Sequence, residues 1–429
     1  MEKTPKSLRL QIGIFGRTNV GKSSFLNMVA GQDVSITSPV PGTTTDVVEK
    51  VMELLPVGPV VFLDTGGMDD ASVLGAKRVE RTRKVFDRSD VSLLILDAEE
   101  WTEFEEEVVR EAAARKSPLV LVVNKSDLKH PSVRFLEDLK QKTSRVLVCS
   151  STDRSKRDGY VNLLKQFLLE VCPEDFLVAP AMLGDIMPKG GLAVLIIPID
   201  FEAPKGRIIL PQVQAIRDAL DHDSMTLVVK ESEYKSSLAK LKTPPDLVVC
   251  DSQVVDRMVA ETPAGVKCTT FSILLSRLKG DIVEMTKGAL AIDRLKKGDK
   301  ILISESCSHH AIDGDIGRIK IPKWIQKYLG HEIGIGVCAG RDFPDDLKSY
   351  KLIIQCGSCM LTRRETLARI QRAKREGVPI TNYGLCISYL QKVLERVIEP
   401  FPEALAAYRA IREETRSLRK DRVSDGVKR

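Results

Sequence analysis

The sequence is poor in aromatic residues and has no dominant charge. Aromatic side chains make up 5% of the 429 residues, and 65 basic residues against 59 acidic ones leave a net charge of +6. Nucleic-acid-binding modules combine a concentrated basic surface with exposed aromatic rings that stack on bases. Because the basic residues here are interspersed with acidic ones, we expect no nucleic-acid partner.

Long apolar stretches are also lacking. No uncharged run reaches the length of about 18 residues that a transmembrane helix needs. The segment Met1–Leu10 is charged and has no apolar core of the kind found in secretory signals. We therefore expect no membrane association and a cytoplasmic protein. In that compartment the nine cysteines are better explained as thiols and metal ligands than as disulfides.

The order of apolar segments predicts an α/β protein with several domains. A chain of 429 residues with 43% apolar composition is expected to build two or three cores. Residues 8–172 alternate short apolar runs with helical stretches, which is typical of a mostly parallel sheet with helices on both faces. The strands predicted there are Leu10–Phe15, Val60–Asp64, Val91–Asp97, Leu119–Asn124 and Val146–Ser150.

Two further α/β units are expected after a linker at Cys172–Pro180. The alternation of strand and helix patterns in residues 180–262 predicts a small unit. Units of this size often complete their core by forming oligomers. A turn at Thr262–Gly265 separates it from a third unit at residues 266–410. The strands predicted in that third unit are Lys300–Ile303, Glu332–Val337, Lys351–Ile354 and Pro379–Thr381.

A phosphate-binding motif follows the first predicted strand. Residues 16–23 read Gly-Arg-Thr-Asn-Val-Gly-Lys-Ser, the pattern of a P-loop. Gly16 and Gly21 let backbone N–H groups approach the phosphates, and Lys22 is placed to reach the β- and γ-phosphates. Ser23 is expected to bind Mg²⁺, with Ser24 beside it as a further nucleotide contact.

Later motifs specify guanine as the base. Asp64–Gly67 reads Asp-Thr-Gly-Gly, in which Asp64 is expected to act on Mg²⁺ and Gly67 on the γ-phosphate. Asn124–Asp127 reads Asn-Lys-Ser-Asp, and a carboxylate at Asp127 can accept from two guanine N–H groups that adenine does not offer. The other expected contacts are Thr44 for Mg²⁺, with Thr43 and Thr45 as alternatives, and Asn124, Lys125, Ser150 and Ser151 around the base.

Hydrolysis of GTP is expected to be slow and stimulated by potassium. Met68 follows Gly67 where many GTPases place a glutamine that orients water, and a methionine cannot do so by hydrogen bonding. Asn19 and the stretch Gly42–Asp46 resemble GTPases of the tRNA-modification and ribosome-assembly superfamily. In those proteins the matching asparagine helps bind a K⁺ ion, so Asn19 is a candidate K⁺ ligand. The catalytic residues expected are Lys22, Thr44, Asp64 and Gly67.

Three cysteines far from the nucleotide motifs predict a metal site. Cys307 follows the strand predicted at Lys300–Ile303, and Cys356 and Cys359 follow the strand predicted at Lys351–Ile354. Because the carboxyl ends of parallel strands meet at one edge of a sheet, the three thiols are expected to converge. The helix expected after Cys359 is predicted to lower the thiol pKa through its N-terminal N–H groups.

Thiolate ligands select zinc or an iron–sulfur cluster. A zinc site would be closed by His309 as fourth ligand, whereas a [4Fe-4S] cluster on three cysteines leaves one iron open or weakly held. Structural zinc sites use short paired motifs, but Cys307 stands 49 positions before Cys356, so the cluster is favoured. The remaining alternatives are a redox C-x-x-C pair and buried structural thiols. The other cysteines, expected to be packed thiols, are residues 149, 172, 250, 268, 338 and 386.

Together these motifs resemble the [FeFe]-hydrogenase maturation GTPases, the HydF family. The resemblance depends on a GTPase domain, a small middle domain, and C-x-H followed after a long spacer by C-x-x-C. Cys307, His309, Cys356 and Cys359 match the family pattern, whereas Gln355 stands where the family has a second histidine. A histidine ligand from that position is therefore not expected.

The resemblance implies a function. Proteins of this family hold a [4Fe-4S] cluster and act as scaffold or carrier for the hydrogenase diiron subcluster. The implied partners are two radical-SAM maturases and apo-[FeFe]-hydrogenase, and the middle domain is implied to form a homodimer. The alternative is a ribosome- or tRNA-associated GTPase with a structural zinc site.

Overall fold

The structure is a computed structural model that describes residues 6–31, 48–64, 84–173, 176, 180–199, 208–306 and 315–426. The chain divides into two units, Met1–Ala179 and Pro180–Arg429. The division falls at the end of the linker expected at Cys172–Pro180. Within the described residues no helix combines the length and apolar composition that a membrane span requires.

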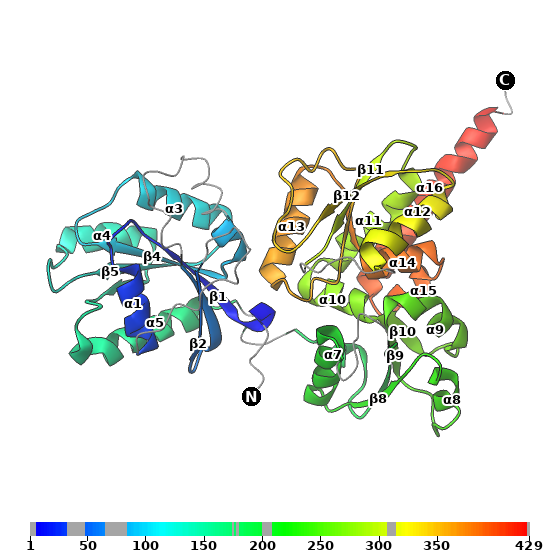
Figure 1. The fold of residues 1–429 in the computed structure, drawn as a ribbon, viewed down its shortest axis with the longest axis horizontal. Helices are drawn as coiled ribbons and strands as arrows, with labels where there is room; N and C mark the ends of the chain where they lie inside the picture. Colours follow the sequence, from blue (N-terminus) through cyan, green and yellow to red (C-terminus); the bar gives the residue numbers. More distant parts are fainter. Residues whose placement is uncertain are drawn as a thin grey trace. The chain divides into compact units, whose positions relative to one another are not determined.

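The first unit is built on a six-stranded sheet (Figure 1). The strand order is β2-β3-β1-β4-β5-β6, and only β2 runs antiparallel to its neighbour. The mostly parallel sheet expected from the apolar runs is thus confirmed. Charged residues interrupt β2, which suits an edge strand and explains why apolar runs did not reveal it. The strands are β1 (Leu10–Phe15), β2 (Val48–Leu54), β3 (Gly58–Asp64), β4 (Val91–Asp97), β5 (Leu119–Asn124) and β6 (Val146–Val148).

Each face of this sheet is covered by helices and forms its own apolar core. Phe25 of α1 and Leu164 of α5 pack on Ile12 and Ile14, whereas Val108 of α3 packs with the opposite face. Figure 1 shows α3 on one side of the sheet and α1 and α5 on the other. The helices are α1 (Lys22–Ala30), α3 (Glu103–Ala114), α4 (Val133–Lys142) and α5 (Arg157–Val171), with short 3-10 turns at Lys6–Leu8 and Arg154–Lys156.

The second unit contains two four-stranded sheets, both fully parallel in the described pairings. Their orders are β10-β9-β7-β8 and β12-β11-β13-β14. One apolar core includes residues of both sheets, such as Leu195 and Ile353, so residues 180–262 and 266–410 share a core. The strands are β7 (Leu192–Ile196), β8 (Met225–Val229), β9 (Leu247–Cys250), β10 (Lys267–Thr270), β11 (Lys300–Ser304), β12 (Gly334–Cys338), β13 (Leu352–Gln355) and β14 (Ile380–Asn382).

The helices of the second unit connect these parallel strands. β10 lies beyond the turn at Thr262–Gly265 and yet pairs with β9, so the first of the two sheets is completed by a strand that the sequence analysis did not include. The α-helices are α7 (Leu210–Asp221), α8 (Tyr234–Leu238), α9 (Val255–Glu261), α10 (Phe271–Lys279), α11 (Ile282–Leu290), α12 (Ile321–Leu329), α13 (Arg363–Arg375), α14 (Tyr383–Leu390), α15 (Leu394–Ile398) and α16 (Pro402–Gly426). Short 3-10 helices lie at Gly184–Ile186, Ser252–Val254 and Ala291–Arg294, and a π-helix lies at Ile316–Lys320.

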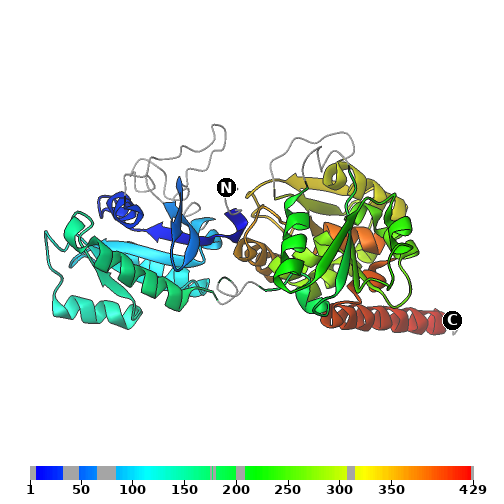
Figure 2. The ribbon, with the colours of Figure 1, turned by 90° about the horizontal axis from the view of Figure 1, so that it is seen from below.

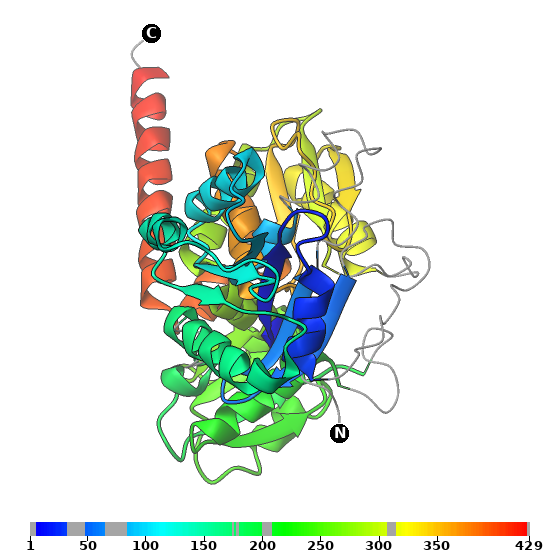
Figure 3. The same ribbon diagram turned by 90° about the vertical axis from the view of Figure 1, so that its left-hand side faces the viewer.

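The last helix extends beyond its unit. α16 begins against the core, where Ala404 is fully buried. Figures 2 and 3 show its C-terminal half as a straight helix projecting away from the rest of the second unit.

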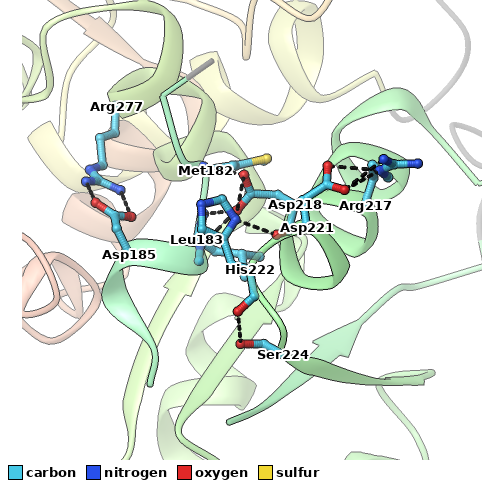
Figure 4. Close-up of polar contacts among 10 residues, drawn as sticks. Met182, Leu183, Asp185, Arg217, Asp218, Asp221, His222, Ser224 and Arg277 are labelled. Carbon is cyan, nitrogen blue, oxygen red and sulfur yellow. Dashed lines mark hydrogen bonds and ion pairs between the residues drawn. The ribbon is translucent and has the colours of Figure 1, made fainter. Parts of the chain in front are cut away.

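A carboxylate fixes the chain where it enters the second unit (Figure 4). Asp218 of α7 accepts from the backbone N–H groups of Met182, Leu183 and Gly184, at 2.9, 2.8 and 2.8 Å. The next residue, Asp185, forms an ion pair with Arg277 of α10, whose Nη1 donates at 2.8 Å. The strand β7 therefore follows a segment that is held to two helices by charged hydrogen bonds.

Replacing Asp218 should open this segment. Asp218→Ala leaves three adjacent backbone donors without their acceptor, and we expect the local opening free energy to fall by about 2–3 kcal/mol. Hydrogen exchange at Met182, Leu183 and Gly184, followed by mass spectrometry, measures this directly.

Asp221→Ala on the same helix is the matched control. Asp221 forms a solvent-exposed pair with Arg217 at 2.8 Å, and such pairs contribute little to stability because water screens the attraction. Equal exchange in the two variants would contradict the anchoring role of Asp218.

Candidate functional site

The phosphate loop connects β1 to α1 and requires glycine at two positions. Gly16 and Gly21 have φ angles of 150° and 91°, which L-residues rarely adopt. A Cβ atom at Gly16 would lie 2.4 Å from the Ile95 carbonyl oxygen, and one at Gly21 would lie 2.4 Å from Asn124 Nδ2. The backbone thus turns tightly enough to present its N–H groups, as the P-loop assignment expects.

The residues that follow Gly21 are arranged for phosphate and metal. Lys22 is buried, and its Nζ donates to the carbonyls of Gly16 and Arg17 at 2.6 and 2.8 Å. Ser23 and Ser24 are exposed in the first turn of α1, whose N-cap Gly21 makes no side-chain capping bond. The first N–H groups of α1 are therefore not capped by a side chain at that position, which suits an anion.

The remaining groups around the phosphates are partly described. Asp64 ends β3 and is 4% exposed. Asn19 is exposed and has a φ of 67°, in the loop where a K⁺ ligand was expected. Thr44, Gly67 and Met68 lie outside the described residues, so their roles stay predictions.

Asn124 at the end of β5 joins the phosphate loop to the base-recognition loop. Its Nδ2 donates to the Val20 carbonyl at 2.9 Å, and its Oδ1 accepts from Ser151 N at 3.1 Å and Ser151 Oγ at 2.8 Å. Asn124 is buried, so it holds the two loops together rather than standing in the open base site. Its neighbour Ser150 is also buried.

The base-recognition groups that reach the surface are Lys125 and Asp127. Lys125 Nζ lies 3.2 Å from Asp97 Oδ2, and Asp127 is exposed. An exposed carboxylate at this position is available to accept from guanine.

The second candidate site lies at the carboxyl edge of the sheet formed by β11 to β14. Cys356 directly follows β13, and its backbone N–H donates to the Ser304 carbonyl on β11 at 2.9 Å. The Cys356 sulfur lies 3.1 Å from Ser306 N, 3.1 Å from Ser306 Oγ and 3.5 Å from Ser358 N. Several potential hydrogen-bond donors therefore surround this one sulfur. Ser306 was not identified from sequence, although it immediately precedes Cys307.

Convergence of all three cysteines is a prediction that the structure does not test. Cys307 and His309 lie outside the described residues, which omit 307–314. In the described part of the chain, no group of three or more His, Cys, Asp and Glu side chains is positioned to hold a metal ion. Cys356 and Cys359 are both half-buried thiols.

Gln355 occupies the position of the missing histidine and points into the protein. It is fully buried, and its Nε2 donates to Ser358 Oγ at 2.5 Å. Ser358 is a buried residue with a φ of 56°, a conformation that non-glycine residues rarely adopt. The buried side chain of Gln355 therefore helps to hold the C-x-x-C loop through its hydrogen bond to Ser358.

The expectation that a helix N-terminus lowers the thiol pKa is wrong for Cys359. α13 begins only at Arg363, and its first N–H groups are satisfied by a capping box of Thr362 and Glu365. Burial instead raises the pKa of the Cys359 thiol, while the positive charge of Lys279 acts in the opposite direction. The cation near this loop is a side chain and not a helix dipole.

Lys279, the last residue of α10, lies beneath the C-x-x-C loop. Burial lowers its pKa to about 8, so most of the ammonium remains protonated at neutral pH. The sequence offered little signal for this residue, because it ends an apolar helical stretch 77 positions before Cys356. Only the packing of α10 under the loop reveals it.

The other cysteines behave as packed thiols. Five of the six are buried, and Cys338 at the end of β12 is half-buried. Burial raises the pKa of Cys149 to about 12 and that of Cys268 to about 11. These thiols are poor candidates for metal binding at neutral pH.

Family models match three segments of the chain. Residues 11–125 match the model described as 50S ribosome-binding GTPase. Residues 182–280 match the hydrogen maturase F dimerization domain, and residues 283–400 match the hydrogen maturase F tetramerization domain. The first unit is therefore a P-loop GTPase domain, and the second unit contains both hydrogen maturase F domains.

Two curated relatives are similar over a little more than a quarter of this chain. The tRNA modification GTPase MnmE of Synechococcus sp. (strain JA-3-3Ab) is 43% identical over 124 residues, which are 28% of this chain and 26% of that protein. GTPase Der of Kosmotoga olearia (strain ATCC BAA-1733 / DSM 21960 / TBF 19.5.1) is 35% identical over 125 residues, 28% of each chain. The chain thus spans about a quarter of the length of these relatives.

Solved structures show low similarity. Era in complex with MgGDPNP and nucleotides 1506–1542 of 16S ribosomal RNA has 21% identity and a TM-score of 0.32, covering 56% of this chain and 98% of that chain. The G domain of the T. maritima FeoB iron transporter has 18% identity and a TM-score of 0.30, covering 38% of this chain and 99% of that chain.

The three segments occur in the order that the motifs predicted. The GTPase domain is followed by the two hydrogen maturase F domains, and the C-x-x-C loop lies within the second of these. The resemblance found in the sequence is thereby confirmed, and the chain belongs to the [FeFe]-hydrogenase maturation GTPase (HydF) family.

Proposed function

We propose that this chain binds and hydrolyses GTP and holds a [4Fe-4S] cluster on Cys307, Cys356 and Cys359. In this role it serves as scaffold or carrier for the diiron subcluster of [FeFe]-hydrogenase. The observation that carries the proposal is the contact of Ser306 with the Cys356 sulfur at 3.1 Å. It brings the residue preceding Cys307 to the C-x-x-C loop, inside a hydrogen maturase F domain.

The described residues suit an iron–sulfur cluster. Cys356 and Cys359 supply thiol ligands, and the sulfur of Cys356 already has N–H and O–H neighbours, as cluster-binding cysteines usually have. When bound, a cluster on three cysteines supplies one iron open to an exchangeable ligand. Because Gln355 is buried against Ser358, it does not close that position, and His309 remains a candidate for it.

The GTPase part of the proposal depends on the first unit. Lys22 and the N–H groups of α1 bind the phosphates, Ser23, Asp64 and Thr44 hold Mg²⁺, and Asp127 selects guanine. Because Met68 cannot orient water, hydrolysis is slow and relies on K⁺ near Asn19. GTP-dependent changes in the first unit then alter contacts with partners.

Self-association involves the second unit. β8 is one of the two edge strands of its sheet, and Met225 and Val228 on it are 57% and 45% exposed. An exposed apolar edge strand is a template for pairing with another chain, and β8 lies in the dimerization-domain match. We propose a cytoplasmic homodimer. Its partners are the two radical-SAM maturases and apo-hydrogenase.

The cysteine assignment is tested by metal analysis. Purified anaerobically and reconstituted with iron and sulfide, the full chain should absorb near 400 nm and carry about four irons. Changing Cys307, Cys356 or Cys359 to Ala should abolish the cluster while GTP hydrolysis is retained.

Cys338→Ala is the matched control, because Cys338 ends the neighbouring strand β12 and should not be needed. One zinc per chain and no cluster would instead support the ribosome- or tRNA-associated alternative.

The potassium hypothesis predicts a cation-dependent rate. GTP hydrolysis by the wild type should be roughly tenfold or more faster in KCl than in NaCl, since a bound cation stabilises the charge that develops on the phosphates. Asn19→Ala should remove most of this difference. The rates are compared at equal ionic strength, and equal rates for the wild type in the two salts would disprove the hypothesis.

The β8 interface predicts charge-sensitive association. Val228→Lys places a charge on the apolar edge and should weaken self-association by at least about tenfold, a change of about 1.4 kcal/mol. Analytical ultracentrifugation over a concentration series measures this. Leu128→Lys, at a 78% exposed residue of the first unit, should leave the association unchanged.

A further inference from the structure

Lys279 makes an unusual set of contacts for a lysine. Lys279 is the last residue of α10, and it is only 3% exposed to solvent. The ammonium donates to three carbonyls of the C-x-x-C loop, those of Ser358 at 3.2 Å, Cys359 at 3.0 Å and Leu361 at 2.9 Å. All three N–H groups of the ammonium are thus used on one short loop.

The geometry ties the loop to the core at several points. Ser358 and Cys359 are adjacent, and Leu361 is the last residue before the cap of α13. Carbonyls that converge on one cation cannot rotate independently, so the loop backbone is held in the shape that places both cysteine side chains. Gly357 packs against the same helix, since a Cβ there would lie 3.3 Å from Leu275 Cδ1.

Lys279 also brings a positive charge into the protein interior. Within the described part of the chain, its hydrogen bonds go to backbone carbonyls. Glu365 acts on it only through longer-range attraction, as do the sulfurs of Cys356 and Cys359. Burying a cation is unfavourable unless negative charge lies nearby. The interactions that favour the charged ammonium of Lys279 come from Cys359, Glu365 and Cys356.

We propose that Lys279 is a positioning residue that fixes the C-x-x-C loop and supplies the buried positive charge opposite its two thiolates. This inference rests on the proposed function, because the thiolates matter most when they hold a cluster. α10 lies in the segment that matches the dimerization domain, whereas the C-x-x-C loop lies in the segment that matches the tetramerization domain. The inference therefore gives a helix of one domain a role in the site of the next.

Two consequences distinguish this role from simple packing. A buried cation beside cluster ligands favours the more negative, reduced state, so it raises the reduction potential. Residues that orient metal ligands typically change metal affinity by about ten- to a hundredfold when removed. A residue that only fills space would show neither a signed change in potential nor recovery by another cation.

The experiment compares Lys279→Met, Lys279→Gln and Lys279→Arg in the full reconstituted chain. Lys287→Met on α11 is the matched control, because Lys287 is exposed and pairs only loosely with Glu284 at 3.8 Å. The measurements are the rate of iron loss to a chelator and the midpoint potential from an EPR-monitored titration. GTP hydrolysis and circular dichroism report whether each variant is folded.

We expect Lys279→Met and Lys279→Gln to lose iron roughly ten- to a hundredfold faster than the wild type and to have a more negative midpoint potential. Lys279→Arg should keep the potential close to that of the wild type. Potentials and loss rates equal to those of Lys287→Met would overturn the inference. If the wild type itself binds no cluster, the proposed function fails, and that outcome is seen before any variant is compared.

The apo-protein provides a test that needs no cluster and no stable loaded variant. Hydrogen exchange of the amides between Ser358 and Leu361 should be faster in Lys279→Met and Lys279→Gln than in Lys287→Met. Unchanged exchange there would show that Lys279 does not hold the loop. Should Lys279→Met fail to fold, the comparison of Lys279→Gln with Lys279→Arg decides the question, because the two differ in charge.

Discussion

A parallel strand that is covered by helices on both faces can present polar chemistry only where it ends. β1 and β5 are buried along their whole length, as is β13. The backbone leaves each of them at the carboxyl edge, where the phosphate loop, the Asn-Lys-Ser-Asp motif and the C-x-x-C loop begin. All three loops therefore depend on one constraint, the burial of parallel strands beneath helices.

The loops at these edges are held in place by hydrogen bonds from buried polar side chains. Asn124 ties the phosphate loop to Ser151. Lys279 and Gln355 hold the C-x-x-C loop. Arg369 of α13 is also buried and donates to Ser304 Oγ at 3.0 Å. Such groups are stable inside a protein only when their hydrogen bonds are satisfied, so each one restricts the backbone around it.

α10 has a central place in the second unit because two of its charged side chains make long-range contacts. Arg277 pairs with Asp185, close to the start of the unit, and Lys279 bonds to the loop after β13. The sheet completed by β10 and the edge that carries the cysteines are thus joined through one helix of nine residues. Apolar residues of α10, such as Ile273 and Leu274, also belong to the single apolar core that spans both sheets.

Sequence alone determined the parallel sheets, the phosphate loop, the guanine motif and the family, because apolar periodicity and fixed local spacing are written in neighbouring residues. It missed β2, whose charged residues hide an edge strand, and β10, which follows a turn that looked like a boundary. Tertiary structure decided that Gln355 points inward, that burial raises the Cys359 pKa, and that Lys279 lies under the loop. Those outcomes depend on contacts between residues far apart in the chain, and no local pattern encodes them.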